Sequence, residues 1–336
     1  MPERDHRLSN IRAISCIAVV ILHTFFACFG VFDTTDLQYK SSLIIRNLMY
    51  WAVPCFIMVT GALLLDPKRS IGYPKIFKKY IPRMVISLIV FTIIFKITDI
   101  ILGLADPGLA SLKDICREVV TGQGWNHMWY LYTMTALYLL IPLVRPFIKH
   151  APRKEILTVI VILTLFLSVI SFITDILNTN SGFYIPVYTI YPLYLILGYY
   201  VYGNYFDSQS IVLLSIFGFI VGMSAFTLLS LNDESLVLKG LINNYSFPLT
   251  VFGALGLFML IMKLNKKIRI LEFIDQNSFG IYLIHMIPLK VFCIKQIINP
   301  YCIGTWFVFV VAAGVFVISL IITALLRKIP LIRKIL

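Results

Sequence analysis

Long apolar stretches constrain this sequence more than any other feature. Each is about 20 residues long and nearly free of charge, which is the length that an α-helix needs to cross a bilayer. The stretches are continuous rather than alternating, and this disfavours the strands of a membrane β-barrel. The sequence therefore predicts an all-α polytopic membrane protein with about ten transmembrane helices. The expected spans lie at 10–31, 43–65, 82–104, 128–147, 156–177, 184–203, 210–231, 244–264, 276–298 and 304–326.

The composition excludes other classes of protein. Hydrophobic residues make up 59% of the chain and charged residues only 13%, whereas soluble domains average about 45–50% and 25%. So few charges and so many aromatic residues exclude a disordered chain. No stretch outside the apolar segments is long enough for a separate soluble core. We therefore expect one integral-membrane domain over residues 1–336, with the first apolar segment kept as an anchor because it lacks a cleavage pattern.

Positive charges are distributed unevenly among the loops. Most of the 29 lysines and arginines lie in 4–12, 68–83, 145–154, 263–269 and 327–334. The positive-inside rule assigns these segments to the cytoplasm, and with them both termini. Topology and attraction to anionic membrane lipid therefore account for the net charge of +13, and no nucleic acid is needed to explain it. The sequence favours no particular oligomeric state.

The first apolar segment carries two polar residues on one face. Arg12 and His23 are eleven residues apart, which on a helix of ~100° per residue leaves them within roughly 20° of each other and ~16 Å apart along the axis. An ionisable residue inside a bilayer is a candidate functional site. Arg12 could also be an ordinary interface anchor, and His23 a packed histidine bonded to a neighbouring carbonyl. Their shared face favours a common channel or groove.

Three further residues are candidates on the acceptor side. His285 should lie near the middle of the bilayer, at about the depth of His23, although a structural hydrogen bond between helices would also explain it. His127 and Trp129 should lie at the outer membrane edge. They suit either an aromatic interface belt or a ledge on which a sugar ring stacks.

The residue inventory narrows the chemistry. The sequence lacks a GxSxG elbow and a glycine-rich phosphate loop. It also lacks an HExxH motif and any cysteine spacing typical of a metal site, so we expect no metal. A buried imidazole is a competent general base. Four cations in the segment 75–83 offer a docking place for a polyanionic cytosolic ligand. This combination favours direct group transfer from an anionic donor to a hydroxyl.

Six motifs resemble the membrane-bound acyltransferase 3 family, and in particular its short one-domain branch, which includes the O-acetyltransferase of enterobacterial common antigen. The first is the arginine, ten residues and histidine of the first span, and the fourth is a Trp-Tyr-Leu segment. They occur in the same order over nearly the whole chain. The motifs are RAISCIAVVILH (12–23), FIMVTGALLL (56–65), FKKYIPR (77–83), HMWYLYTMTALYLLIPLV (127–144), PLYLILGYYV (192–201) and SFGIYLIH (278–285).

The resemblance implies a ten-span enzyme of the bacterial cytoplasmic (inner) membrane. It would take an acyl group, acetyl or another, from acyl-CoA on the cytoplasmic side and pass it to a hydroxyl of a surface or lipid-linked glycan. His23 and Arg12 match the essential histidine and arginine of the family. Lys78, Lys79 and Arg83 fall in the segment that meets the coenzyme A phosphates.

The sequence departs from the family pattern at two positions. Many members carry aspartate three residues before the arginine, where this chain has Ser9, and this removes a possible partner for Arg12. Many also have more arginines where this chain has Lys78 and Lys79, and lysine does not grip a phosphate in bidentate fashion. A transporter or exporter of a glycan or small polar substrate remains an alternative, as does a sensor without chemistry.

Overall fold

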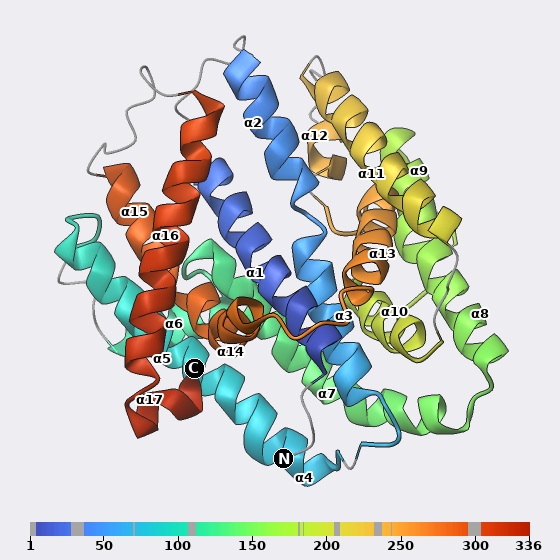
Figure 1. Ribbon diagram of the computed structural model, residues 1–336, viewed down its shortest axis with the longest axis horizontal. Coiled ribbons are helices and arrows are strands. Elements are labelled where there is room, and N and C mark those ends of the chain that lie inside the picture. Colours follow the sequence, from blue (N-terminus) through green and yellow to red (C-terminus); the bar gives the residue numbers. More distant parts are fainter. Residues whose placement is uncertain are drawn as a thin grey trace.

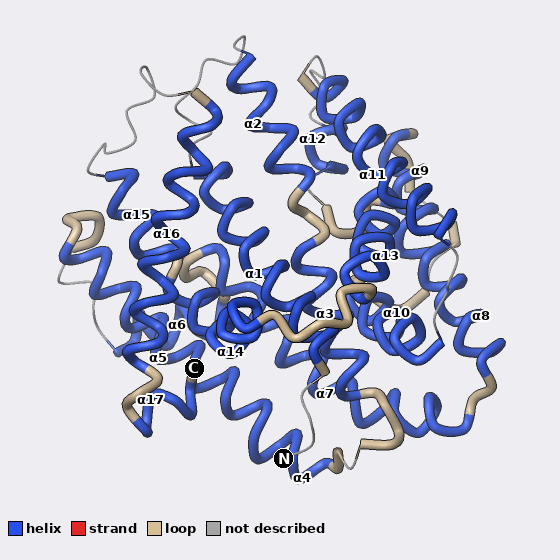
Figure 2. Tube along the Cα trace, in the orientation of Figure 1, coloured by secondary structure: helices blue, strands red, loops and turns tan. Residues whose placement is uncertain are grey.

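The computed structural model describes residues 5–27, 37–69, 71–106, 112–180, 182–183, 185–204, 209–231, 237–242, 244–294 and 304–336. Over these residues the chain is built from helices and short connections, and they contain no strand (Figure 2). The all-α class that the sequence predicts is confirmed.

Figure 1 shows the arrangement of the helices and labels them in chain order. Two of them continue through π-helical turns, at Ile76–Tyr80 before α5 and at Leu165–Ile170 between α8 and α9, and a short 3-10 turn, Asn126–Met128, precedes α7. The helices are α1 (His6–Ala27), α2 (Leu37–Leu48), α3 (Ala52–Leu64), α4 (Tyr73–Lys75), α5 (Ile81–Ile101), α6 (Leu112–Thr121), α7 (Trp129–His150), α8 (Arg153–Thr164), α9 (Ser171–Ile176), α10 (Tyr191–Asn204), α11 (Gln209–Ser230), α12 (Val237–Ile242), α13 (Pro248–Met262), α14 (Arg269–Ile284), α15 (Met286–Ile294), α16 (Thr305–Leu326) and α17 (Pro330–Ile335).

Seven of the described helical runs are long and apolar enough to cross a membrane. They coincide with seven of the ten expected spans. The three remaining spans, at 184–203, 244–264 and 276–298, fall on shorter helices. Of the expected spans, residues 28–31, 184 and 295–298 lie outside the described residues. The seven runs are His6–Ala27, Leu37–Leu64, Tyr73–Ile101, Asn126–His150, Arg153–Ile176, Gln209–Ser230 and Thr305–Leu326.

Prolines explain two of the shorter helices. Helix α10 begins only at Tyr191, because Pro186 precedes it and Pro192 is suited to the first helical turn. The expected span at 276–298 is interrupted at His285, between α14 and α15. Pro288 lies four residues after Ile284. A proline at this position has no N–H to donate to the backbone carbonyl of Ile284, and its ring collides with that carbonyl.

The outer helices expose many large apolar side chains. On α11, Leu214 is 72% exposed and Phe217 is 67% exposed. Contiguous apolar surface of this kind is costly in water and marks a membrane or protein contact. The exposure is therefore consistent with helices that contact lipid.

Helix α1 lies in the middle of the bundle (Figure 1). It contacts α2, α3, α13, α14 and α16, so most of its length is covered by other helices. Its start is fixed by Asp5, whose Oδ1 accepts the backbone N–H of Arg7 at 2.9 Å and so caps the helix. Burial alone would raise the pKa of Asp5, but hydrogen bonds from Arg7 and Tyr202 lower it to about 2.

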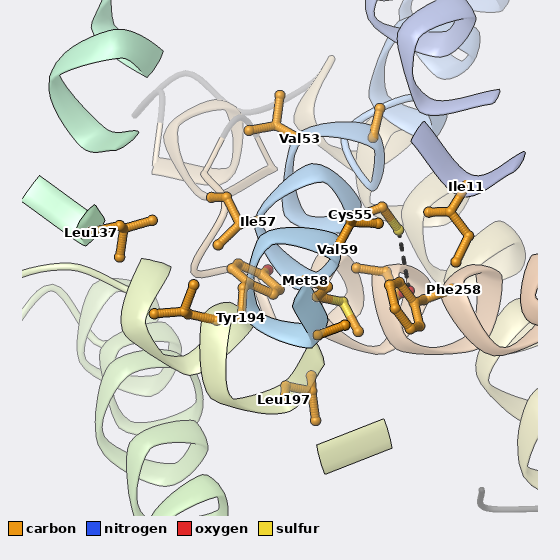
Figure 3. Close-up of a cluster of buried hydrophobic side chains, with 14 of the residues drawn as sticks. Ile11, Val53, Cys55, Ile57, Met58, Val59, Leu137, Tyr194, Leu197 and Phe258 are labelled. Carbon is orange, nitrogen blue, oxygen red and sulfur yellow. Dashed lines mark hydrogen bonds between the residues drawn. The ribbon is translucent and has the colours of Figure 1, made fainter. Parts of the chain in front are cut away.

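Two glycines bring α3 and α10 into direct backbone contact. A Cβ added at Gly61 would lie 1.8 Å from the carbonyl oxygen of Leu195, and one at Gly198 would lie 2.0 Å from that of Met58. Small residues of this kind allow helices in a membrane to approach closely. Figure 3 shows the side chains that surround this crossing, among them Tyr194 and Met58.

We expect Gly198→Ala to destabilise the fold, because the backbone of Met58 cannot yield as a side chain would. Overpacking a core usually costs about 1–3 kcal/mol. The matched control is Gly218→Ala on α11, where nothing lies within 4 Å of the added carbon. Thermal unfolding in detergent checks this, and equal midpoints for the two variants would contradict it.

Candidate active site

Arg12 and Asp275 form an ion pair between α1 and α14. Nε of Arg12 lies 2.7 Å from Oδ1 of Asp275, and Nη2 donates to Oδ2 at 3.2 Å. The carboxylate is fully buried, whereas the arginine side chain is 29% exposed. Asp275 on α14 is therefore the acidic partner of Arg12 that is missing at Ser9. The sequence did not predict this ion pair.

His23 and His285 form a second contact between the same two helices. Nδ1 of His23 lies 2.9 Å from Nε2 of His285, and the ring centroids are 4.9 Å apart. His285 is fully buried, and His23 is half-buried. The expectation that the two histidines share a depth is supported, because the structure brings their rings into hydrogen-bond contact.

The surroundings of His285 fix the proton positions of a neutral pair. Its Nδ1 lies 2.7 Å from the carbonyl oxygen of Tyr282 and 3.1 Å from that of Ile281. Carbonyl oxygens only accept, so Nδ1 carries the hydrogen and Nε2 has the lone pair. That lone pair accepts the Nδ1–H of His23. The lone pair of His23 is then on Nε2, which has no hydrogen-bond partner among the described residues.

These contacts also fix the direction of the two helices. The pairs 12–275 and 23–285 advance together along the chain, so α1 and α14 run parallel. Between them, the thiol of Cys16 donates to the carbonyl oxygen of Ser278 at 3.7 Å.

His127 is buried beside the histidine pair rather than at an exposed membrane edge. Its ring centroid lies 5.5 Å from that of His285 and 6.5 Å from that of His23. The hydroxyl of Tyr282 donates to its backbone oxygen. The side chain is therefore packed inside the bundle against α14, and the position of its turn at the outer membrane edge stays a prediction.

A cluster of polar and aromatic contacts holds that turn. Nε1 of Trp125 donates to Asp99 at 2.9 Å, and the indole stacks on Phe95 with centroids 4.2 Å apart. Lys290 forms an ion pair with Asp99 and lies over the indole. Helices α5 and α15 are thereby joined next to His127.

Trp129 belongs to a different aromatic group. Its ring stacks on Tyr191 with centroids 5.6 Å apart and lies 5.5 Å from Tyr245. The side chain of Tyr130 connects this group to the site, because it contacts both Trp129 and Tyr282. The two expected acceptor-side residues, His127 and Trp129, therefore lie in neighbouring but separate clusters.

The expected donor-side residues line one cavity of about 720 Å³. Lys78 and Lys79 reach it from the π-helical turn, Arg83 from the first turn of α5, and Arg12 from α1. Sequence reasoning missed the basic residues that complete the lining from the C-terminal part of the chain, which are Arg327, Arg333 and Lys334. Nothing in the sequence predicts that these residues line a cavity, because they resemble the other positive charges on the expected cytoplasmic side.

Two further cavities meet the first at Arg12 and Arg83. One of about 510 Å³ extends along Lys68, Arg69 and Lys75. The other, of about 150 Å³, extends between the helices and is lined by Val19, Tyr130, Tyr138 and Tyr282 among others. Arg12 and Arg83 line all three, so they occupy the junction of a basic entrance and a narrower, mostly apolar interior.

The narrow cavity stops one turn short of the histidine pair. It reaches Val19, four residues before His23, and His23 is not among the described residues that line it. Tyr130 and Tyr282, with ring centroids 5.2 Å apart, form its wall there. On the far side of this wall the ring of Tyr282 lies 6.1 Å from that of His285. The arrangement is a cationic entrance and a narrow cavity, with a two-tyrosine wall before the histidine pair.

Comparison with known proteins identifies one match. The model of the acyltransferase 3 family, described as an acyltransferase domain, matches residues 5–326. No curated protein and no solved structure matches the chain.

We expect Arg12→Gln to lower the free energy of unfolding by about 3 kcal/mol, because it removes the guanidinium that pairs with the buried carboxylate of Asp275. Adding Asp275→Asn to that variant should recover most of the loss, since the buried negative charge that Arg12 neutralises is then removed as well. Thermal unfolding of the single and double variants measures this. The control is Lys154→Gln, an exposed cation on α8. A double variant less stable than Arg12→Gln would contradict the interpretation.

Proposed function

The chain belongs to the acyltransferase 3 family of membrane acyltransferases, and on this premise we propose that it is an O-acyltransferase that uses acyl-CoA. The donor is cytosolic acetyl-CoA or another acyl-CoA, and the acceptor is a hydroxyl of a surface or lipid-linked glycan. The observation that carries the proposal is the His23–His285 pair, which leaves a lone pair on Nε2 of His23 beyond a cation-lined cavity.

The proposed topology has ten spans in a bacterial cytoplasmic membrane. Helices α10 and α13 and the broken pair α14–α15 supply the three crossings beyond the seven long helices. The basic segments then lie in the cytoplasm with both termini. Contacts among these segments support a common side, since Arg145 donates to the backbone oxygen of Arg69, and Asn10 donates to those of Leu264 and Lys266.

The donor would bind with its phosphates at the basic entrance. Lys78, Lys79 and Arg83 supply charge there. Arg12 forms an ion pair with Asp275 and also lines the cavities. It is therefore suited to guide the pantetheine arm inward. The wall of Tyr130 and Tyr282 has to open for the thioester to meet His23.

The transfer itself needs a base and a leaving thiolate. Nε2 of His23 takes the acceptor hydroxyl proton as the hydroxyl oxygen bonds to the thioester carbonyl carbon. The tetrahedral intermediate then collapses, and its carbon–sulfur bond breaks. The coenzyme A thiolate leaves and receives the proton from His23. The products are an O-acyl ester and free coenzyme A.

His285 acts in this scheme as a positioning residue. Its Nδ1–H is engaged by backbone carbonyls and its Nε2 by His23, so it has no N–H left for the oxyanion. It keeps the His23 ring in the tautomer that can accept a proton and orients it. We therefore assign oxyanion stabilisation to another group.

The test of the activity uses purified protein in detergent with isotope-labelled acetyl-CoA and an extract of lipid-linked and surface glycans. We expect release of the coenzyme A thiol and a gain of one acetyl mass on a sugar hydroxyl. A transporter with the same polar residues would release no thiol. Absence of both signals, with correctly folded protein, would overturn the proposal.

We predict that His23→Ala lowers the transfer rate by about 10²–10⁴-fold, the usual worth of a general base. The variant should still elute as a monodisperse species. His150→Ala is the control, because His150 is exposed at the end of α7 and bonds only to its own helix. Full activity of His23→Ala would remove this residue from the mechanism.

For His285 we predict a loss of kcat of about 10²-fold in His285→Leu, with the KM for acetyl-CoA unchanged, since the residue lies outside the donor cavities. His285→Gln should retain more activity than the leucine variant, because its amide oxygen can accept the Nδ1–H of His23. Equal kcat values for the two variants would contradict a positioning role.

A further inference from the structure

The C-terminal helix α17 is fastened to the helix that carries the expected donor-binding segment. Nε of Arg83 donates to the backbone oxygen of Ile335 at 3.2 Å, and Nη2 donates to that of Leu336. The hydroxyl of Ser87, one turn further along α5, donates to the backbone oxygen of Arg83 at 2.7 Å and lies 3.2 Å from the oxygen of Ile335. These bonds use the backbone oxygens of Ile335 and Leu336 and do not involve the basic side chains of α17.

The basic side chains of this part of the chain face the large cavity. Arg333 and Lys334 on α17 and Arg327 at the end of α16 line it together with Lys78 and Lys79. Arg333 and Lys334 are exposed, and Arg327 donates to Asn277 at 3.4 Å. The cavity therefore has basic residues on two separate segments, the π-helical turn and the C-terminal region.

Basic side chains outnumber acidic ones in the lining of this cavity. Asp275 is the one acidic side chain among the described lining residues, and it is paired with Arg12. Gathering cations in one concavity raises the local potential and attracts anions. A phosphomonoester carries about −1.5 to −2 charges at neutral pH, and the 3′-phosphate and diphosphate of coenzyme A bring several such charges together. The volume of about 720 Å³ falls in the range of small-molecule sites.

We propose that the C-terminal region forms half of the nucleotide site, in which Arg327, Arg333 and Lys334 bind the phosphates of the donor opposite Lys78 and Lys79. This inference rests on the proposed acyl-CoA donor. A lipid headgroup has the same phosphate chemistry. The shared lining residues Arg12 and Arg83 favour the nucleotide, because they connect this cavity to the narrow one that leads toward the histidines.

The experiment measures binding of coenzyme A, 3′-dephospho-coenzyme A and phosphatidylglycerol to detergent-purified protein by calorimetry. The test variant is Arg333→Ala/Lys334→Ala. The control is Lys149→Ala/Lys154→Ala, which removes two exposed cations from the same expected side, away from the cavity. The charge-conserving variant Arg333→Lys/Lys334→Arg separates charge from any effect on folding.

We expect the test variant to bind coenzyme A at least about 10-fold more weakly and with a shallower salt dependence, because it loses two phosphate partners. The control and the charge-conserving variant should keep wild-type affinity. The loss should be smaller for 3′-dephospho-coenzyme A if these residues bind the 3′-phosphate.

Three outcomes would overturn the inference. Unchanged coenzyme A affinity in Arg333→Ala/Lys334→Ala would refute it while leaving the acyl-CoA donor intact. Weakened binding of phosphatidylglycerol without weakened binding of coenzyme A would make the cavity a lipid site. Failure of the wild-type protein to bind coenzyme A at all would refute the donor and this inference together.

Discussion

The register between α1 and α14 depends on two polar contacts inside an otherwise apolar bundle. A charge or an unpaired polar group is expensive in such surroundings, so Arg12 is stable there with Asp275 as its partner, and His23 with His285. Sliding one helix by a single residue shifts it by about 1.5 Å and turns it by about 100°. Such a slip would break both contacts at once. The pairing that satisfies the buried groups is therefore also what orients the imidazole of His23.

The sequence predicts one side of this site well and the other poorly. The face shared by Arg12 and His23 follows from a spacing of eleven residues on an uninterrupted helix, and α1 contains both. Asp275 and His285 are ten residues apart, which on an ideal helix leaves them roughly 80° apart. His285 follows the last residue of α14 with helical backbone angles, so the spacing of the two residues predicts no shared face. The proline that interrupts the helix is visible in the sequence, but the partner across the interface is not.

The same limit applies to the basic residues. Counting lysines and arginines beside each apolar segment predicts which ends lie together, and contacts such as that of Arg83 with Ile335 agree. The count gives equal weight to an exposed cation such as Lys149 and to Arg333, which lines the cavity. Their difference arises from the packing of α17 on α5, a contact between segments about 250 residues apart. Apolar length thus predicts the helices, whereas the cavities depend on contacts that no local pattern encodes.

In the proposed reaction, the wall of Tyr130 and Tyr282 would keep the thioester away from the base. A thioester that reached the imidazole before the acceptor arrived would be open to water, since the base that activates a sugar hydroxyl can also activate water. Tyr282 contacts both sides of the wall, through Tyr130 toward the cavity and through the backbone of His127 toward the histidines. Displacement of the His127 turn by an acceptor would therefore act directly on the tyrosine that closes the donor cavity. Tyr282 therefore links the backbone of the His127 turn to the wall of the narrow cavity.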